Sequence, residues 1–343
     1  MGFLGVTEVG PATPTLVTSH AAFTRQFGSD VKGDGSPRYL AHAVAGFFEN
    51  KGSRCFIQRV GDNSGILTEE HFTLGLRALE DVPEVALLAC PDEHTFANAG
   101  IARALVEQCE RLKNRFAILS APYNASPVTT HQPSVQSACA AYYYPWLRVK
   151  DSRKGVDVDI PPHGHIAGIF ARVDERKGVH KAPAGESIQG VSGLQLNVTD
   201  EQQKILQPRG VNVLRTFAGR GHVVWGARTT SADPLWRYVN VRRLFIFVEQ
   251  SIEQGMQWAV FEINNAALWT RVIRQVSEFL IRLWRNGAFP GAKPEEAFFV
   301  KCDQTTMTQD DIDNGRLICL IGIAPVRPSE FVIFRISQQC RGI

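Results

Sequence analysis

Two histidines separated by one glycine form the motif of this sequence that most suggests chemistry. His163 and His165 stand in PPHGHIAGIFAR, residues 161–172, just before small and apolar residues typical of a helix start. A histidine in such a setting can act as the general base for a serine nucleophile or as a metal ligand. Either use requires partners elsewhere in the chain.

The partners that these two roles require are missing from the sequence. The motif is similar to the histidine segment of subtilisin-like serine proteases, which carry the serine in a Gly-Thr-Ser-x-Ala turn after a strand. No such turn follows His165, and no third ligand stands at a metal-binding spacing from the two histidines. We therefore predict that His163 and His165 are structural, that the chain has no catalytic residue, and that it binds neither a metal nor a cofactor.

A glycine-rich stretch, FAGRGHVVWGAR at residues 217–228, is a second candidate site. Gly219, Gly221 and Gly226 do not fit the spacing Gly-x-Gly-x-x-Gly, and the stretch lacks the Gly-Lys-Ser/Thr of a phosphate-binding loop. A hairpin turn between two strands explains these glycines better than a nucleotide site does.

Acidic residues gather in a third candidate, residues 302–315. Thr308 is expected to cap a short helix that ends at Gly315 and carries Asp310 and Asp311 in its first turn. The helix dipole favours negative charge at that end, and no base, nucleophile or metal-binding histidine accompanies the acids. Local helix electrostatics explain these residues without an active site.

Composition gives no support for several classes of partner. The 343 residues carry a formal net charge of +3, which gives no reason to expect nucleic acid or an anionic membrane. No apolar run approaches the roughly 20 residues that span a bilayer, and the start lacks signal-peptide features, so we expect synthesis in the cytosol. The seven scattered cysteines form no CxxC pair, which predicts neither a disulfide framework nor a zinc site.

Alternating strand and helix patterns predict the fold class. Apolar runs at 55–60, 84–91 and 115–122 end in turn-prone residues and are typical of buried strands. Residues 40–48 and 96–112 have helical spacing. We therefore predict an α/β fold in which helices cover a mostly parallel sheet.

Changes in amino-acid composition along the chain predict two domains. Residues 151–206 are rich in glycine, proline and charge, which favours long surface connections with little core. Apolar residues become frequent again after Pro208, where two predicted strands flank the turn AGRG. We predict a boundary near Leu206, with domains at 1–206 and 207–343 and an α+β arrangement in the second.

Three further elements are expected in the second domain. Residues 233–255 predict a helix capped by Asp233, and QWAVFEI at 257–263 predicts a strand. A long amphipathic helix follows Asn265. One face of this helix is basic, through Arg271, Arg274 and Arg282, and is either solvated or a contact for an acidic partner.

Two long apolar strands near the chain end remain without a catalytic explanation. RLICLIGIAPV (316–326) and EFVIFRIS (330–337) are joined by RPS and predict a terminal strand pair. An apolar pair with a free edge invites pairing with another chain. The residues expected to link subunits are Leu317, Cys319, Ile321, Ile323, Phe331, Ile333, Arg335 and Gln338.

Long stretches of the sequence resemble the contractile tail sheath proteins of tailed phages and phage-tail-like injection particles. The stretches that resemble the C-terminal domain of that family are VVWGARTTSADPLWRYVNVRRLFIFVEQSI, LWRNGAFPGAKPEEAFFVKCDQTTMTQDDIDNGRLIC and IAPVRPSEFVIFRISQ. Earlier stretches, PTLVTSHAAFTRQFG, YLAHAVAGFFENKGSRCFIQRV and HIAGIFARVDERKGVHKAPA, are similar to its other parts. The resemblance implies a central domain of subtilisin-like topology that is not a protease.

The resemblance also implies partners. Copies of the chain would form stacked rings or a helix around an inner tube, linked by terminal arms that add strands to a neighbour's sheet, and contraction would drive the tube through a target envelope. The implied partners are further copies, the inner tube protein, and baseplate and terminal cap proteins, with no nucleic acid and no membrane insertion. Assembly would follow synthesis in the bacterial cytoplasm, giving a virion tail or an extracellular particle.

The family's tube-facing segment lies in its C-terminal domain, and the capped helix from Thr308 is the best candidate for it here. The tube-facing candidates are Thr308, Asp310, Asp311, Asp313, Arg316, Lys301 and Lys293.

One departure from the family lies at the N-terminus. Family members usually begin with a segment of the Pro-Gly-Val-Tyr type, whereas this chain starts at GFLGVTEVG, so it is either shortened there or links differently. The short middle region, without a large inserted domain, favours an injection particle over a large phage. The alternatives are a baseplate- or cap-proximal sheath variant and, from another class, a degenerate hydrolase or nucleotide-binding enzyme on the same α/β core.

Overall fold

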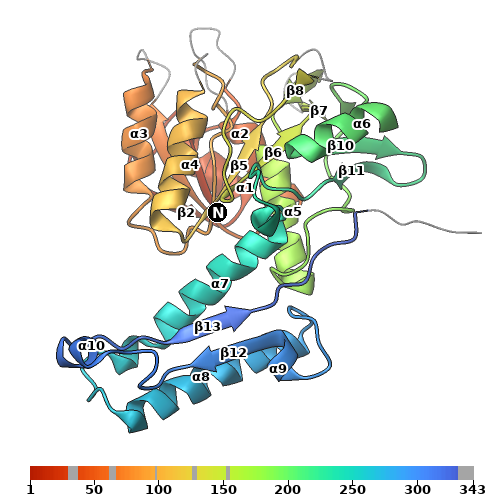
Figure 1. Ribbon diagram of the computed structural model, residues 1–343. Helices are drawn as coiled ribbons and strands as arrows, with labels where there is room; N and C mark the ends of the chain where they lie inside the picture. Colours follow the sequence, from red (N-terminus) through yellow and green to blue (C-terminus); the bar gives the residue numbers. More distant parts are fainter. Residues whose placement is uncertain (30–37, 62–66, 97–98, 126–129, 152–154, 331–343) are drawn as a thin grey trace, which may run out of the picture.

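The computed structural model describes most of the chain, namely residues 1–29, 38–61, 67–96, 99–125, 130–151 and 155–330. A large sheet covered by helices forms the upper part of the molecule in Figure 1, and a smaller helical body with a two-stranded sheet forms the lower part. One long helix runs between them. We call the upper part the central region and the lower part the C-terminal body.

Six neighbouring strands of the large sheet run parallel, and an antiparallel strand closes each edge. In sheet order the strands are β11 (Gly221–Trp225), β10 (Val211–Phe217), β6 (Ala140–Tyr144), β5 (Phe116–Ser120), β4 (Leu87–Ala89), β1 (Gly2–Val6), β3 (Cys55–Gly61) and β2 (Thr15–Val17). The predicted α/β class with a mostly parallel sheet is confirmed.

Helices cover both faces of this sheet. Phe3 and Leu4 of β1 enter opposite cores, because side chains alternate across a strand. The core that contains Phe3 is lined by α1 (His20–Phe27), α2 (Leu40–Glu49) and α5 (His163–Lys177). The core that contains Leu4 is lined by α3 (Glu69–Ala78), α4 (Gly100–Leu112) and α6 (Asp200–Leu206).

The prediction of surface connections over residues 151–206 is wrong. This stretch contains α5, which is buried from His163 to Phe170, as well as β8 (Asp157–Ile160) and β9 (Gly193–Leu194) of a small sheet with β7 (Leu147–Lys150). The glycines serve close packing here: a Cβ added at Gly164 would lie 1.9 Å from the carbonyl oxygen of Ala43 in α2.

The boundary predicted near Leu206 falls inside the central region. β10 follows it directly and pairs in parallel with β6, and β11 forms the edge of the same sheet. The hairpin predicted around AGRG exists, but its first strand is part of the large sheet and cannot be separated from it.

The C-terminal body packs around two helices. Its elements are α7 (Val239–Gly255), α8 (Ala266–Arg285), α9 (Pro294–Ala297), β12 (Phe298–Lys301), α10 (Gln309–Asp313) and β13 (Leu320–Ile323). Leu244 and Val248 of α7 pack with the apolar stripe of α8, whereas Val239 and Ile246 of α7 enter the core of the central region. The long helix therefore belongs to both parts.

Two elements predicted on either side of α7 differ from the structure. Asp233 caps a 3₁₀ turn over Pro234–Trp236, and α7 starts only at Val239, because residues 227–229 form backbone hydrogen bonds with residues 237–239. The segment 257–263 does not form the predicted strand: it forms a 3₁₀ turn over Gln257–Ala259 and then a second turn, in which Glu262 N donates to Ala259 O and Phe261 has a φ of 69°.

The close approach of α5 to α2 yields a stability prediction. Gly164→Ala should lower the free energy of unfolding by about 1–3 kcal/mol, because its Cβ would meet the backbone of Ala43, which cannot move independently of its helix. Urea unfolding measures the loss. The matched control is Gly255→Ala, whose Cβ would meet no atom within 4 Å; an equal loss in both variants would contradict the packing argument.

Candidate functional site

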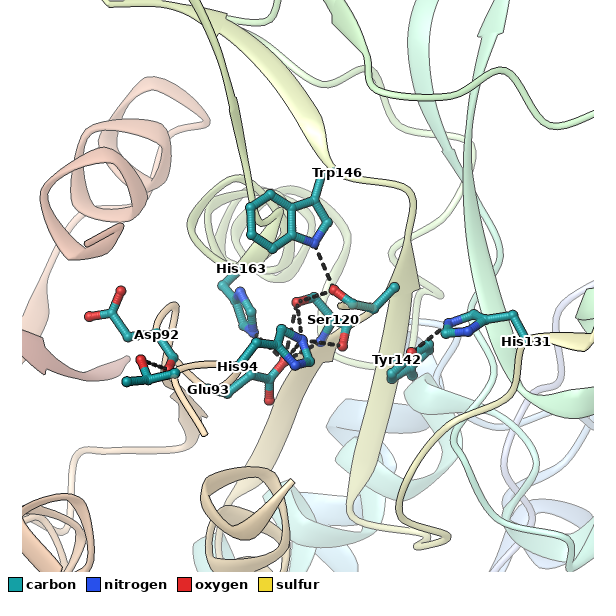
Figure 2. A network of polar contacts seen from close by, with 10 residues as sticks. Asp92, Glu93, His94, Ser120, His131, Tyr142, Trp146 and His163 are labelled. Atoms are coloured by element: carbon teal, nitrogen blue, oxygen red, sulfur yellow. Dashed lines mark hydrogen bonds and ion pairs between the residues drawn. The ribbon is translucent and has the colours of Figure 1, made fainter. Parts of the chain in front are cut away.

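Three buried polar side chains and one partly buried histidine, His94, meet where β4 and β5 end and α5 begins (Figure 2). Glu93 Oε1 accepts hydrogen bonds from Ser120 N at 2.6 Å and Ser120 Oγ at 3.1 Å. The Nε2 atoms of His163 and His94 lie 3.1 Å and 3.4 Å from the same oxygen. One carboxylate therefore joins two strand ends and a helix, and we call this group the Glu93 cluster.

The cluster favours an ionised carboxylate. Burial alone would raise the pKa of Glu93, but the imidazoles of His163 and His94 outweigh it and lower that pKa to about 2. Burial would lower the pKa of His94, and the Glu93 carboxylate outweighs it and raises that pKa. The neighbouring Asp92, which accepts from the backbone of Tyr39, differs: burial raises its pKa to about 6.

The geometry of the Glu93 cluster is not that of a hydrolase triad. His94 approaches both Glu93 and Ser120 through the same atom, Nε2, whereas a triad needs the acid on one ring nitrogen and the serine on the other. Ser120 is only 1% exposed, and its hydroxyl donates to the carboxylate. Nearby, Trp146 Nε1 donates to the carbonyl of Ala121 at 2.6 Å. A substrate has no access to this serine.

The second histidine of the motif lies elsewhere. His165 packs against Gly46 of α2, and burial lowers the pKa of its imidazole to about 4. The structure thus separates the two histidines that the motif brings together in sequence. Among the described residues, no group of three or more His, Cys, Asp or Glu side chains is arranged to hold a metal ion.

Sequence reasoning missed Glu93, His94 and Ser120. A usable signal existed, because parallel strands bring their carboxyl ends to one edge of a sheet, and PDEH follows β4 as Ser120 ends β5. The contact between Glu93 and His163, which are 70 positions apart, depends on how α5 packs on the sheet, and no local sequence pattern predicts it.

The apolar strand near the chain end pairs differently from the prediction. β13 is antiparallel to β12, with Leu320 opposite Lys301 and Ile323 opposite Phe298. The predicted partner strand, 330–337, falls almost wholly outside the described residues, as do the linking candidates Phe331, Ile333, Arg335 and Gln338. Directly after β13 the chain remains in contact with the C-terminal body: Ala324 N donates to Ala297 O, and Val326 N donates to Ala288 O.

The four described linking candidates face inward. Ile321 and Ile323 of β13, with Leu317 and Cys319 just before it, alternate in sequence and pack against the core of the C-terminal body. In the described part of the chain, this sheet has only two strands, so each has a second edge with no strand beside it. Any link through β12 or β13 would therefore use backbone groups, while the side chains hold the strand in position.

The tube-facing candidates gather around α10, with one exception. Thr308 and Asp311 form a reciprocal capping box, and Arg316 Nε donates to Asp311 Oδ1 at 2.8 Å and Arg316 Nη2 to Asp310 Oδ2 at 2.5 Å. The exposed acids and Arg316 are therefore largely paired with one another. The exception is Lys293, which precedes α9 at the other end of β12 (Figure 1).

Next to α10 the structure exposes an apolar tip that the sequence did not predict. We define the tip as Val260, Phe261 and Ile263, whose exposures are 56%, 103% and 77%. Asn264 ties it to the capped helix, because its amide donates to the backbone carbonyl of Arg316. Grouped exposed apolar side chains of this size mark contact surfaces in many proteins.

Two sequence families match consecutive parts of the chain. The family described as "Phage tail sheath protein central domain" matches residues 65–230, and "Phage tail sheath C-terminal domain" matches residues 231–339. Within the described residues, no helix has the length and apolar character needed to cross a membrane.

Solved structures match nearly the whole chain. A subunit of the anti-feeding prophage helical sheath in the contracted state is 35% identical with a TM-score of 0.84, and the match covers 98% of this chain and 92% of that chain. For a chain of the anti-feeding prophage baseplate, the identity is 35%, the TM-score 0.86 and the coverages 98% and 93%.

The curated phage relatives are longer than this chain. The tail sheath protein of Enterobacteria phage T4 is 27% identical over 196 residues, which are 56% of this chain and 29% of the phage protein. The chain thus spans less than a third of that relative's length.

The Glu93 cluster generates a pH prediction. The folded pKa of Glu93, about 2, lies below its ordinary value of 4.5, so its stabilisation is complete above pH 4.5 and is lost as the pH falls toward 2. Glu93→Gln should therefore cost about 2–3 kcal/mol of unfolding free energy at pH 6 and less at pH 3.

Chemical unfolding of both proteins between pH 2.5 and 7 measures this difference. Subtracting the two curves separates Glu93 from Asp92, which titrates in both. A difference that does not depend on pH would contradict the ionised carboxylate.

Proposed function

We propose that this chain, which belongs to the contractile tail sheath family, is a structural subunit that polymerises around an inner tube and contracts to drive that tube through a target envelope. The observation that carries the proposal is the likeness to the anti-feeding prophage helical sheath, at 35% identity over 98% of this chain. The family is one of structural proteins, which agrees with the inaccessible serine of the Glu93 cluster. We also propose a subtilisin-like topology for the central region, supported by the histidine that begins α5 on a mostly parallel sheet.

The proposed particle is an injection particle. Its sheath subunits would have about the length of this chain, as in the anti-feeding prophage, where the match covers 92% of the solved chain. The T4 sheath protein is matched over only 29% of its length. A second candidate, a baseplate-proximal sheath variant of the same particle, is favoured by the equally close match to a chain of the anti-feeding prophage baseplate.

We propose that neighbouring subunits are linked through the sheet of the C-terminal body. Leu317, Cys319, Ile321 and Ile323 fix β13 on its own core, so a strand from a neighbour could pair with a free edge without unfolding either subunit. Strand pairing tolerates large rotations of the bodies it joins when the connecting chain bends, and this is what a contracting lattice requires. Phe331, Ile333, Arg335 and Gln338 remain the proposed contribution of the chain end to a neighbour.

The tube-facing surface is proposed to be α10 with its flanks. Asp310, Asp313, Thr308, Arg316 and Lys301 supply exposed polar groups there, and Asp311 is partly buried. Because the acids and Arg316 are paired with one another, the ionic contribution of one subunit is small. The apolar tip beside them adds a contact that salt does not screen. Lys293 remains a proposed member only if the tube contact extends along β12. Baseplate and terminal cap proteins would contact the ends of the polymer.

The first test of this function is electron microscopy of the purified protein and of a chain that lacks residues 338–343. The full chain should form hollow striated cylinders, and the deletion should remain largely unassembled, because it removes part of the proposed link. Thermal melting of both proteins controls for folding. Cylinders of normal length and stability from the deletion would contradict a C-terminal link, and their absence from the full chain would contradict the function itself.

The second test addresses the tube. Arg316→Glu with Lys301→Glu, made in cells that also produce the tube protein, should give mainly contracted or tube-free sheaths. Raised salt should weaken the extended state of the unmutated particle, because exposed charges act over roughly 8 Å at physiological ionic strength. Arg271→Glu with Arg274→Glu on α8 is the matched control. Normal tube-filled particles from the first variant, and defective ones from the control, would assign the tube contact to α8.

A further inference from the structure

Glu330, the last described residue, is held by side chains of the central region. Arg228 Nε donates to Glu330 Oε1 at 2.7 Å and Arg228 Nη2 to Glu330 Oε2 at 2.6 Å. Gln207 Nε2 and the Tyr238 hydroxyl each add a hydrogen bond, both at 3.1 Å. The side chains of Arg228 and Glu330 are each only 12% exposed. We call this arrangement the Glu330 clamp.

The clamp is an ion pair shielded from water. Burial works to raise the pKa of Glu330, but the bonds from Arg228, Gln207 and Tyr238 outweigh it and lower that pKa. The carboxylate reciprocally raises the pKa of Arg228. A two-point contact between guanidinium and carboxylate also fixes direction, which a single hydrogen bond does not. The clamp therefore fixes the position of residue 330 as well as its charge.

Arg228 is itself anchored to the large sheet. Its backbone N–H donates to Asn212 Oδ1 and its carbonyl accepts from Asn212 Nδ2, both at 2.7 Å. Asn212 lies in β10 and is 1% exposed. A continuous path of short contacts thus runs from Glu330 through Arg228 into the interior of the sheet.

The chain between β13 and the clamp crosses from one part of the molecule to the other. Val326 N donates to Ala288 O in the C-terminal body, and Val326 O accepts from Asn240 Nδ2 in α7. Residues 327–330 complete the crossing. Although β13 belongs to the C-terminal body, residue 330 is therefore held on the central region.

We infer that the Glu330 clamp anchors the C-terminal linking segment. Force exerted by a neighbouring subunit on that segment is then transmitted to Arg228 and the large sheet, and not to the two-stranded sheet of the C-terminal body. The inference rests on the proposed function, because it requires the chain end to link subunits. Without the clamp, the link would begin after Val326. Four more residues would then be free, which adds roughly 13 Å of reach. A looser tether lowers the effective concentration of the linking strand and permits several registers between neighbours.

The test compares Glu330→Gln with a matched control elsewhere in the central region. Glu186 accepts two hydrogen bonds from Arg176, both at 2.8 Å, and its side chain is 17% exposed while that of Arg176 is 52% exposed. Glu186→Gln therefore removes a more exposed carboxylate–arginine pair that has no connection to the chain end. Thermal melting reports folding, and electron microscopy with sedimentation reports assembly. We expect both variants to remain folded, with the larger drop in melting temperature for Glu330→Gln because Arg228 is more buried than Arg176. At a temperature where both are fully folded, the concentration needed for assembly should rise about tenfold with Glu330→Gln alone.

Further variants test whether the clamp acts as a unit. Arg228→Lys keeps the charge but loses the two-point geometry, and it should impair assembly nearly as much as Glu330→Gln. The double variant Arg228→Gln with Glu330→Gln should be no worse than either single change. If Glu330→Gln does not fold, Tyr238→Phe decides: impaired assembly with normal melting supports the clamp, and normal assembly overturns it.

The outcomes separate this inference from the proposed function. Normal assembly of Glu330→Gln, in a protein whose deletion of 338–343 fails to assemble, overturns the clamp alone. Normal assembly of that deletion overturns the C-terminal link, and with it the clamp.

Discussion

The arrangement of the whole subunit depends on α7, because its side chains enter two hydrophobic cores. Val239 and Ile246 are buried with the large sheet, and Leu244 and Val248 with α8. Arg243 strengthens the junction: its guanidinium forms two hydrogen bonds with Asp174 of α5 and lies 4.9 Å from the ring centre of Phe170. Since neither core is complete without α7, rotating the two parts relative to each other would open apolar surface. The subunit is therefore expected to move as one body, and large motions should occur between subunits.

Local patterns predicted the elements that are held mainly by their own residues. The long amphipathic helix starts at Asn265, which caps it through two backbone N–H groups, and the capping box at Thr308 also follows from sequence. The mostly parallel sheet follows from the alternation of buried strands and helices.

Features that depend on distant partners could not be predicted in this way. The small and polar residues around α5 read as loop, yet Gly164 and Gly168 let this helix meet the backbone of α2. The segment 257–263 is rich in apolar residues and is expected from the sequence to be a strand, but no strand of the described part of the chain pairs with it, and its apolar side chains form the tip. In the sequence, Glu330 is only the first residue of the strand predicted over 330–337, and the fold alone brings Arg228 to it from 102 positions away.

The Glu93 cluster gives an enzyme-like architecture a structural role. In parallel sheets, the carboxyl ends of the strands are the usual location of ligand sites, because loops there leave a crevice with unpaired polar groups. Here Glu93 fills that position, and its Oε1 contacts the end of β5, His94 and the first residue of α5. Removing the imidazoles would leave the buried Glu93 carboxylate with fewer partners, so separating α5 from the strand ends is costly. The same helix α5 also carries Asp174, which accepts a hydrogen bond from Arg243 of α7. The contacts of Glu93 with α5 and of α5 with α7 therefore connect the strand ends of the large sheet to the helix that packs against the C-terminal body.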